Sequence, residues 1–229
     1  MSHVFDVVVR EVPGIRGTEL APEIVERLPV SAPPAPWRLR ASGCLWVAPA
    51  PRCAGAALQK GIAGRPLAVG GMFVAYEETP VGPYNEIIGF VALRRRWSVA
   101  AHIPFIAVDS ADSVVGGRAN WSLPKTLATF SGHPVRERAI RGDHDDWQVT
   151  AQAQALGPVL PAAWRFTLVQ ARAVGYEERS HGRARGRLRP ALVQVRASGV
   201  RELTGWLHSG RYPGAIIERF DGELGPRSE

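Results

Sequence analysis

A strict alternation of apolar and polar residues is the feature that most limits what this chain can fold into. It is clearest at 147–155, where Trp147, Val149 and three alanines interleave with polar residues. Successive side chains of a strand point to opposite faces, so a period of two predicts a half-buried strand. Similar runs, bounded by Gly, Pro and Asp, occur at 5–9, 44–48, 67–76, 84–93, 97–108, 164–176 and 191–197. The chain should be mostly β.

Helical patterns are short and few. They occur at 52–62, at 110–115 and at 200–208, and we expect them to flank a sheet. The proline-rich stretch 14–37 is interpreted as a surface connection or an arm. The glycine- and arginine-rich stretch 177–190 is predicted to be a mobile loop.

Length and composition point to one ordinary globular domain. At 229 residues the chain can build a single core, and we expect one domain over residues 1–229. The hydrophobic content is 45%, and no apolar run approaches the ~20 residues of a membrane span. The start of the chain lacks the pattern of a secretory signal, which predicts a cytoplasmic protein without a membrane partner. Cys44 and Cys53 are too few for a disulfide framework or a four-sulfur zinc site.

The charge is strongly positive, with a formal net charge of +7. Basic residues concentrate at 94–96 and in the alternating run Arg183, Arg185, Arg187 and Arg189. Neither run carries the interleaved aromatic residues of nucleic-acid-binding surfaces, so a solvated face is the preferred interpretation and no nucleic-acid partner is expected. Nucleic-acid binding through the second run stays open as an alternative, which a steep salt dependence would reveal.

Several enzyme classes lack their motifs here. The chain has no nucleophile elbow, no dinucleotide-binding glycine pattern, no P-loop and no H-E-x-x-H segment. The acidic cluster 143–146 follows Gly142 and precedes a strand, as an ordinary turn does, so we predict neither a metal nor a cofactor. His102 lies within an apolar strand and is retained only as a possible pocket residue.

Lys125 is unusual because lysine is rare in this chain. The chain has two lysines, Lys60 and Lys125, against 26 arginines, so a charge needed at position 125 would ordinarily be an arginine. Lysine differs because it can lose its proton when desolvated, and only the neutral amine attacks a carbonyl. Lys125 follows Pro124 and is flanked by Leu123 and Leu127. These residues fit a reactive amine or a surface lysine in a turn.

The surrounding sequence resembles a known family. Residues 106–130 read IAVDSADSVVGGRANWSLPKTLATF, in which a Gly-Arg stretch leads to an aromatic-x-x-Pro-Lys sequence. This pattern is similar to the acetoacetate decarboxylase family, whose lysine forms a Schiff base. The segment 82–86, ending in Tyr84-Asn85-Glu86, resembles that family's Tyr-x-Glu segment. Further likeness at 57–67 extends the match over about 57–130, and 205–220 resembles bacterial members of the wider superfamily.

The resemblance implies a fold and a set of site residues. The fold would be α+β and mostly β, with a closed or cone-shaped antiparallel β-barrel core and a few short flanking helices. Lys125 would form the imine with a small oxo acid or another carbonyl substrate, and Glu86 would transfer a proton or orient the substrate. The resemblance makes Tyr84 and Trp121 candidate pocket walls, and a substrate carboxylate would meet an arginine, for which Arg118 and Arg40 are candidates. We also expect a homo-oligomer.

Two departures from the family pattern leave the reaction open. The decarboxylases carry a second lysine after the reactive one, where this chain has Thr126, and their acidic residue after Gly-Arg is replaced by Ala119. Either desolvation alone would then have to favour the neutral amine, or an arginine such as Arg118 would have to help from elsewhere in the fold. Superfamily relatives without the lysine pair include Schiff-base aldolase-dehydratases acting on pyruvate-like acids. A non-catalytic small-molecule-binding protein that keeps the pocket is the alternative.

Overall fold

The computed structural model of the chain describes residues 12–172 and 176–228. The strand predicted at 5–9 lies outside the described residues. Strands dominate the rest, and they are β1 (Trp37–Pro49), β2 (Arg65–Glu78), β3 (Tyr84–Arg94), β4 (Val99–Val108), β5 (Lys125–Leu127), β6 (Thr129–His133), β7 (Ala139–His144), β8 (Trp147–Ala155), β9 (Leu160–Ala171), β10 (Glu177–Gly199) and β11 (Gly210–Ser228). The helices are α2 (Pro22–Val25), the 3-10 helix η1 (Arg52–Ala57), α3 (Ala111–Trp121) and α4 (Arg201–Thr204).

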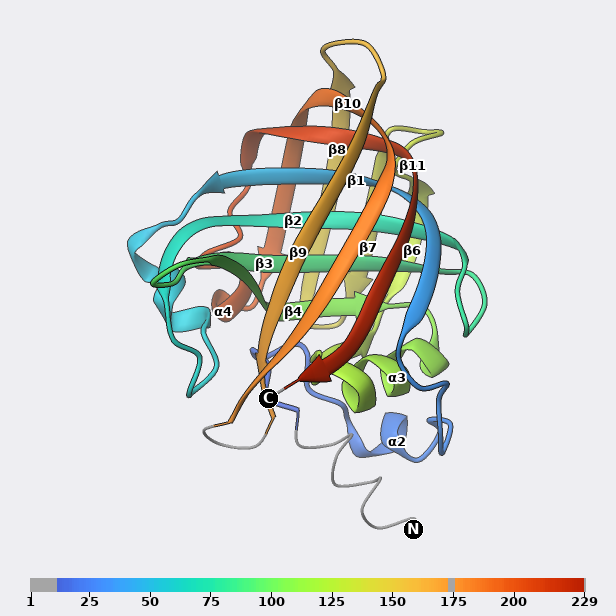
Figure 1. The fold of residues 1–229 in the computed structure, drawn as a ribbon, viewed down its shortest axis with the longest axis vertical. Coiled ribbons are helices and arrows are strands. Elements are labelled where there is room, and N and C mark those ends of the chain that lie inside the picture. Colours follow the sequence, from blue (N-terminus) through green and yellow to red (C-terminus); the bar gives the residue numbers. More distant parts are fainter. Residues whose placement is uncertain (1–11, 173–175, 229) are drawn as a thin grey trace.

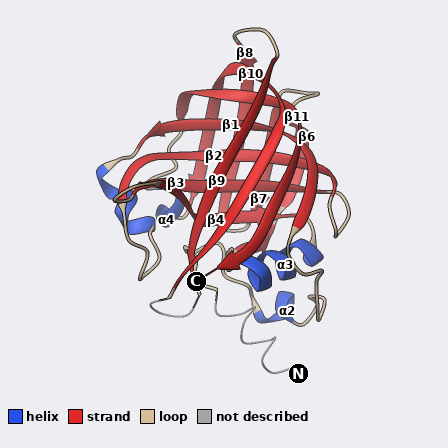
Figure 2. Cartoon of the chain, in the orientation of Figure 1, coloured by secondary structure: helices blue, strands red, loops and turns tan. Residues whose placement is uncertain are grey.

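The described strands form one 11-stranded sheet that returns on itself like a ring. Its order runs β11-β1-β2-β3-β4-β9-β10, and β10 pairs back onto β11. Strands β8, β7 and β6 continue from β10, while β5 attaches to β4 (Figure 2). Almost all pairs are antiparallel, but β5 and β9 both run parallel to β4, and the β4–β9 link is the single residue pair Ala101–Leu168.

The strands β1 to β4 are covered on both faces. In Figure 1, β9 and the adjoining parts of β10 and β11 cross steeply over β1–β4. On this side Ala41 and Val74 pack with Ala184 and Phe220. A larger core joins the other face of β1–β4 to β8 and the second half of β10, and it includes the buried aromatic residues Trp46, Phe73, Phe105, Trp147 and Trp206. Such two-sided burial explains why these strands are rich in apolar residues at both alternating positions.

The sequence predicted the fold class correctly. The protein is mostly β with short helices, and β8 coincides with the strand predicted at 147–155. The prediction of a mobile loop at 177–190 is wrong, because these residues form the first half of β10. Their backbone groups pair with β9 on one side and β11 on the other, so the ladders override the poor strand propensity of Gly182 and Gly186.

The proline-rich segment packs against the sheet. Ile15 and Thr18 are buried, and the carbonyl oxygen of Gly17 accepts a hydrogen bond of 3.0 Å from the indole nitrogen of Trp147. The proline-rich segment therefore includes a wall of the core that leads into β1. Within 12–172 and 176–228, no helix combines the length and apolar character needed to cross a membrane.

Candidate active site

The position of Lys125 is set by the short connection between α3 and β5. Ser110 begins α3 as its N-cap, and its side chain accepts a 3.2 Å hydrogen bond from the backbone nitrogen of Ser113. The helix ends at Ser122, whose φ of 53° is left-handed and turns the chain back toward the sheet. Lys125 then opens β5 beside Ile106 of β4. The turn thus brings the lysine beneath its own helix.

Lys125 and Glu86 form a buried ion pair. The lysine Nζ lies 2.6 Å from Glu86 Oε2, and their side chains are 4% and 3% exposed. Glu86 comes from β3, 39 residues earlier in the sequence. Burying two charges is costly unless they are paired and hydrogen-bonded, so each of these two side chains depends on the other for compensation of its charge. The structure brings together the two residues predicted to be catalytic.

Three further side chains surround this pair. Ser113 Oγ lies 2.9 Å from Lys125 Nζ, and the hydroxyl of Tyr76 donates a 3.0 Å hydrogen bond to Glu86 Oε1. The Tyr84 ring covers the amine, with 5.2 Å between Nζ and the ring centroid. Burial, reinforced by the charge of Glu86, raises the pKa of both tyrosines well above its usual value. Both phenols therefore stay protonated at neutral pH.

A glycine in α3 makes room for the lysine. A methyl group placed on Gly117 would come within 2.4 Å of Lys125 Cδ, far closer than van der Waals contact. The lysine side chain therefore crosses the helix at a position where only glycine fits. This close approach explains Gly117, and a methyl group on the preceding Gly116 would come within 2.4 Å of the Trp37 ring, so both glycines are kept despite their poor helix propensity.

Arg118 holds the main chain around the site. It is 1% exposed, and its guanidinium donates to the carbonyl oxygens of Lys125 at 2.7 Å and Thr18 at 2.8 Å. Burial lowers its pKa to about 10, so it remains charged at neutral pH. These two hydrogen bonds connect the segment around Lys125 to the segment around Thr18. Arg118 therefore positions the main chain, and the carboxylate binding predicted for Arg118 stays a prediction.

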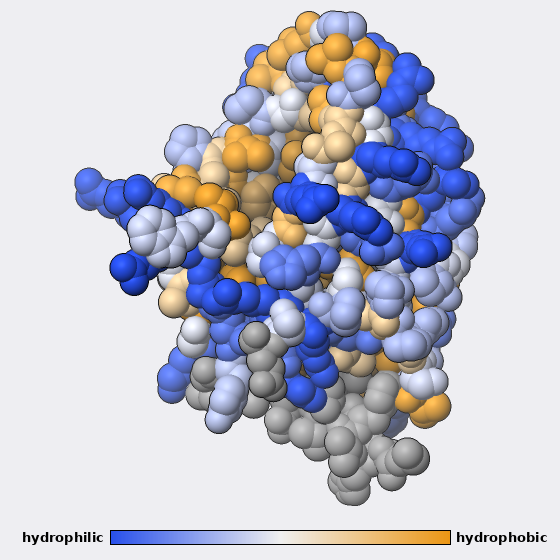
Figure 3. Space-filling model, in the orientation of Figure 1, coloured by the Kyte–Doolittle hydropathy of each residue, from blue (hydrophilic) through white to orange (hydrophobic). Residues whose placement is uncertain are grey.

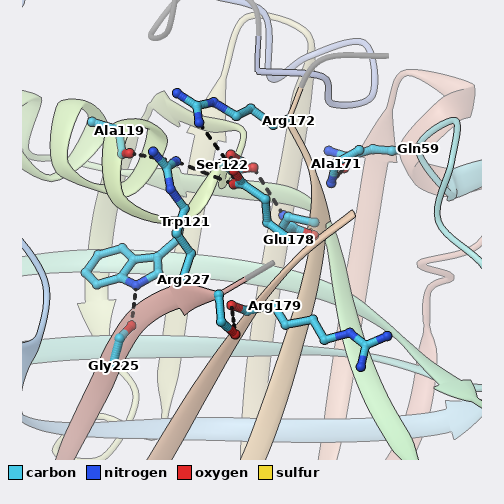
Figure 4. A network of polar contacts seen from close by, with 12 residues as sticks. Gln59, Ala119, Trp121, Ser122, Ala171, Arg172, Glu178, Arg179, Gly225 and Arg227 are labelled. Atoms are coloured by element: carbon cyan, nitrogen blue, oxygen red, sulfur yellow. Dashed lines mark hydrogen bonds and ion pairs between the residues drawn. The ribbon is translucent and has the colours of Figure 1, made fainter. Parts of the chain in front are cut away.

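Trp121 belongs to the anchor at the end of α3. Its indole nitrogen donates a 2.7 Å hydrogen bond to the carbonyl oxygen of Gly225 (Figure 4). Its ring also meets Trp37 edge-on. In the same network, Ser122 Oγ donates to Glu178 at 2.8 Å and Arg227 donates to the carbonyl oxygen of Ala119 at 3.1 Å. The last strand thus fixes the end of the helix that precedes Lys125.

His102 lies in the core. It is fully buried, its Nδ1 is 2.9 Å from the carbonyl oxygen of Val169, and its Nε2 accepts from the backbone nitrogen of Gln59 at 3.4 Å. Burial lowers its pKa, so the ring is neutral at neutral pH. These hydrogen bonds connect His102 to Val169 and Gln59 in the core, and neither involves Lys125 or Glu86.

Arg40 lies on the outer face of β1. It pairs with Glu78 and, at 3.1 Å, with Asp221. It borders what we call the arginine groove, two adjoining hollows of about 880 and 730 Å³ across β1, β9, β10 and β11. The arginines that line it are Arg38, Arg40, Arg165, Arg183, Arg185, Arg187 and Arg219. Hydrophilic side chains are prominent on the face seen in Figure 3. The structure therefore places Arg40 in a different region from Lys125.

Thr126 occupies the position after the lysine. It is fully buried, and its hydroxyl lacks a hydrogen-bond partner among the described residues. A lysine in its place would have to bury a second ammonium group. The acidic cluster 143–146 forms the end of β7 and the following turn, where Asp143 pairs with Arg141 at 2.6 Å. Within the part of the chain that the structure describes, no group of three or more His, Cys, Asp or Glu residues is arranged to hold a metal ion.

The model of the acetoacetate decarboxylase family matches residues 58–157, a range that contains Glu86, Ser113 and Lys125. Solved structures of this kind share the fold. An acetoacetate decarboxylase structure superimposes with a TM-score of 0.62 at 13% identity, covering 92% of this chain and 97% of that one. Over residues 58–157 the chain is therefore similar to the acetoacetate decarboxylase family, and it shares the fold of the solved decarboxylase.

Two other solved structures have a similar fold. The acetoacetate decarboxylase of Legionella pneumophila gives a TM-score of 0.55 at 14% identity, over 86% of this chain and 88% of its own. The enduracididine biosynthesis enzyme MppR complexed with pyruvate gives 0.60 at 9% identity, over 86% and 90%. No curated protein matches the chain significantly. The comparisons therefore show a family match over residues 58–157 and a shared fold.

Proposed function

We propose that this protein is a lyase that forms a Schiff base between Lys125 and a small oxo acid. The observation that carries the proposal is the 2.6 Å contact between Lys125 Nζ and Glu86 Oε2 in a buried site. The supporting relatives include acetoacetate decarboxylases and an enzyme solved with pyruvate. The family match covers both residues.

The first step would be activation of the amine. Glu86 is placed to accept the proton that Nζ must lose before it can attack a carbonyl. Ser113 would hold the nitrogen through its 2.9 Å contact while the proton moves. Tyr76, bound to the other carboxyl oxygen, would keep Glu86 oriented.

The chemistry then follows from the imine. Nζ adds to the carbonyl carbon, the carbinolamine loses water, and the resulting iminium cation accepts the electron pair of a bond β to nitrogen. That bond joins carbon to CO2, to hydrogen or to another carbon. Glu86 would remove a proton from the carbon next to the iminium to form the enamine, or return a proton to the enamine carbon. Decarboxylase-like and aldolase-dehydratase-like outcomes share this electron sink.

A second candidate is a small-molecule-binding protein that no longer reacts. Two observations favour it. The ammonium of Lys125 is committed to Glu86 and is 4% exposed, and Thr126 replaces the second lysine of the decarboxylases. Such a protein would bind an oxo acid reversibly without a covalent adduct.

Borohydride trapping separates these two functions. The protein is incubated with pyruvate, acetoacetate or a longer oxo acid and reduced, and mass spectrometry locates the secondary amine. Lys60 is the internal control, because it is the only other lysine and lies exposed. The proposal expects an adduct on Lys125 that Lys125→Arg abolishes. An adduct confined to Lys60, or none across the panel, would refute it.

A further inference from the structure

A cleft of about 630 Å³ lies against the outer side of the Lys125 site. Its volume falls within the range of about 300 to 1,000 Å³ that small-molecule pockets occupy. We call it the tyrosine cleft, and it is lined by parts of β1, β2, β3, the turn after β6, and β11. Its main side chains are Ser42, Tyr76, Tyr84, His133, Arg136 and Glu218.

Two tyrosines belong both to this cleft and to the buried site. Tyr76 lines the cleft and donates to Glu86, and Tyr84 lines the cleft and covers the Lys125 amine. Their ring centroids are 4.5 Å apart. The two rings are therefore a thin partition between Nζ and the cleft, and movement of their side chains would open the site without unfolding the sheet.

Ser42 marks the cleft as a place for a ligand. The serine is 3% exposed, lines the cleft, and has a hydroxyl with no hydrogen-bond partner among the described residues. Buried hydroxyl groups are usually paired, so an orphaned one beside a cavity is suited to a ligand. Ser42 also lies where the pairing of β1 with β11 shifts register between Ala41 and Gly43. Bulges of this kind re-aim side chains next to functional sites.

The charges around the cleft are largely compensated. Asp109 accepts hydrogen bonds from the backbone and side chain of Asn85, and Glu218 pairs with Arg189 at 3.2 Å. Burial and the nearby charge of Arg136 lower the pKa of His133, which is therefore neutral at neutral pH. Among the described residues that line the cleft, Arg136 alone carries a permanent positive charge, accompanied by the exposed Glu77.

We infer that the tyrosine cleft is the path by which a substrate reaches Lys125 and the compartment for the part of the substrate beyond its carbonyl. This inference rests on the proposed function. The ligand it fits is an oxo acid longer than acetoacetate, with a polar tail that hydrogen-bonds to Ser42 and meets Arg136 at the mouth. The reacting end passes between Tyr76 and Tyr84.

Blocking the cleft tests the path directly. In a Cys53→Ser background, which removes the exposed native cysteine, Val135→Cys places a thiol in the cleft for a bulky maleimide. Ala163→Cys in the arginine groove is the matched control, and Arg136→Cys is a second attachment point should Val135→Cys fail to fold. Formaldehyde with cyanoborohydride then methylates accessible amines, and mass spectrometry follows Lys125 and Lys60 separately.

The expected result is specific to one lysine and one label. Methylation of Lys125 should slow by about tenfold or more with the cleft label, since only local unfolding would then expose a buried amine. Lys60 and the groove-labelled control should be unchanged. Methylation of Lys125 at the unlabelled rate would overturn the inference, whatever the oxo-acid result.

The oxo-acid adduct supplies a second, independent measurement. With the cleft label, trapping of a long oxo acid on Lys125 should slow as methylation does. In unlabelled protein, Ser42→Ala should reduce trapping of a long oxo acid more than trapping of pyruvate. Equal loss for both acids would contradict a tail-binding compartment. Absence of any adduct in unlabelled protein would instead refute the proposed function, while the formaldehyde rates would still decide the path.

Discussion

The buried lysine site and the arginine groove hold charge in opposite ways. At the first, one ammonium and one carboxylate share a volume closed to water, and each has further hydrogen-bonded neighbours. At the second, seven arginines lie on an open face, where Arg38 and Arg183 share Glu223 at 3.6 and 3.2 Å. Exposed pairs contribute about 0 to 1 kcal/mol, whereas breaking a buried pair costs about 3 to 5 kcal/mol. One ion pair in the buried lysine site is therefore expected to matter more for stability than one ion pair in the arginine groove, although the groove carries more charges.

The largest expected effect comes from Lys125→Met. It should abolish adduct formation and lower the free energy of unfolding by about 3 to 5 kcal/mol, because Glu86 is left buried without its cation. Adding Glu86→Gln should restore much of that stability. Denaturant unfolding measures both variants, with Arg40→Met in the arginine groove as the control expected to lose little stability, because exposed ion pairs are screened by solvent. Equal losses at Lys125 and Arg40 would erase the contrast between the two regions.

Glu86→Gln alone should separate binding from turnover. The amide keeps the shape of the side chain but cannot carry a proton to or from the substrate carbon, so turnover should fall by roughly 100-fold. The borohydride adduct should still accumulate, because reduction removes each imine irreversibly even where the imine forms slowly. Rates with an oxo acid that gives turnover, compared with the extent of trapping, measure the two quantities. A loss below about threefold would leave Glu86 as a structural residue of β3.

Gly117→Ala tests the fit between α3 and the lysine. The added methyl overlaps Lys125 Cδ, so overpacking should cost about 1 to 3 kcal/mol and slow adduct formation by displacing the amine. Gly55→Ala is the control, because a methyl group there meets nothing within 4 Å. Thermal unfolding and trapping rates check both. Unchanged trapping in Gly117→Ala would mean that the lysine position is less constrained than this contact implies.

The smallest effect should come from the arginine groove. Replacing the exposed residues Arg183, Arg185 and Arg187 with serine should change the free energy of unfolding by no more than about 0.5 kcal/mol per site and leave adduct formation intact. Nucleic-acid binding with a steep salt dependence in the parent, lost in this variant, would give the groove a function of its own.

The sequence predicted the parts of the site that depend on local pattern. Lys125 and Glu86 were predicted because the short motifs around them resemble those of a known family, and the structure brings the two side chains together. Their catalytic roles stay predictions. Ser113 was missed, since a serine in the first turn of a helix is ordinary until the chain turns at Ser122 and brings the lysine beneath it. Tyr76 was missed because it reaches the site only through pairing of β2 with β3, where it lies opposite Tyr84.

The errors in the fold have a similar cause. The helix predicted at 110–115 continues to Trp121, because packing of Gly117 against Lys125 outweighs the low helix propensity of glycine. The first half of β10 was predicted as a loop from its composition, although the spacing of Arg183, Arg185 and Arg187 already showed the period of a strand. Pairing with β11, whose strand was not predicted, decides the outcome there.

The length of β10 has a consequence for how this protein comes apart. Its 23 residues pair with β9 in the first half, with β8 in the second, and with β11 along most of the strand. β10 belongs both to the layer with β9 and to the layer with β8. When β10 detaches, neither layer keeps its hydrogen-bond ladder, so unfolding of one layer should unfold the other. Amide protons in the two halves of β10 should therefore exchange with solvent at similar opening free energies. Hydrogen exchange would then report a single cooperative unit rather than two stacked sheets that melt in turn.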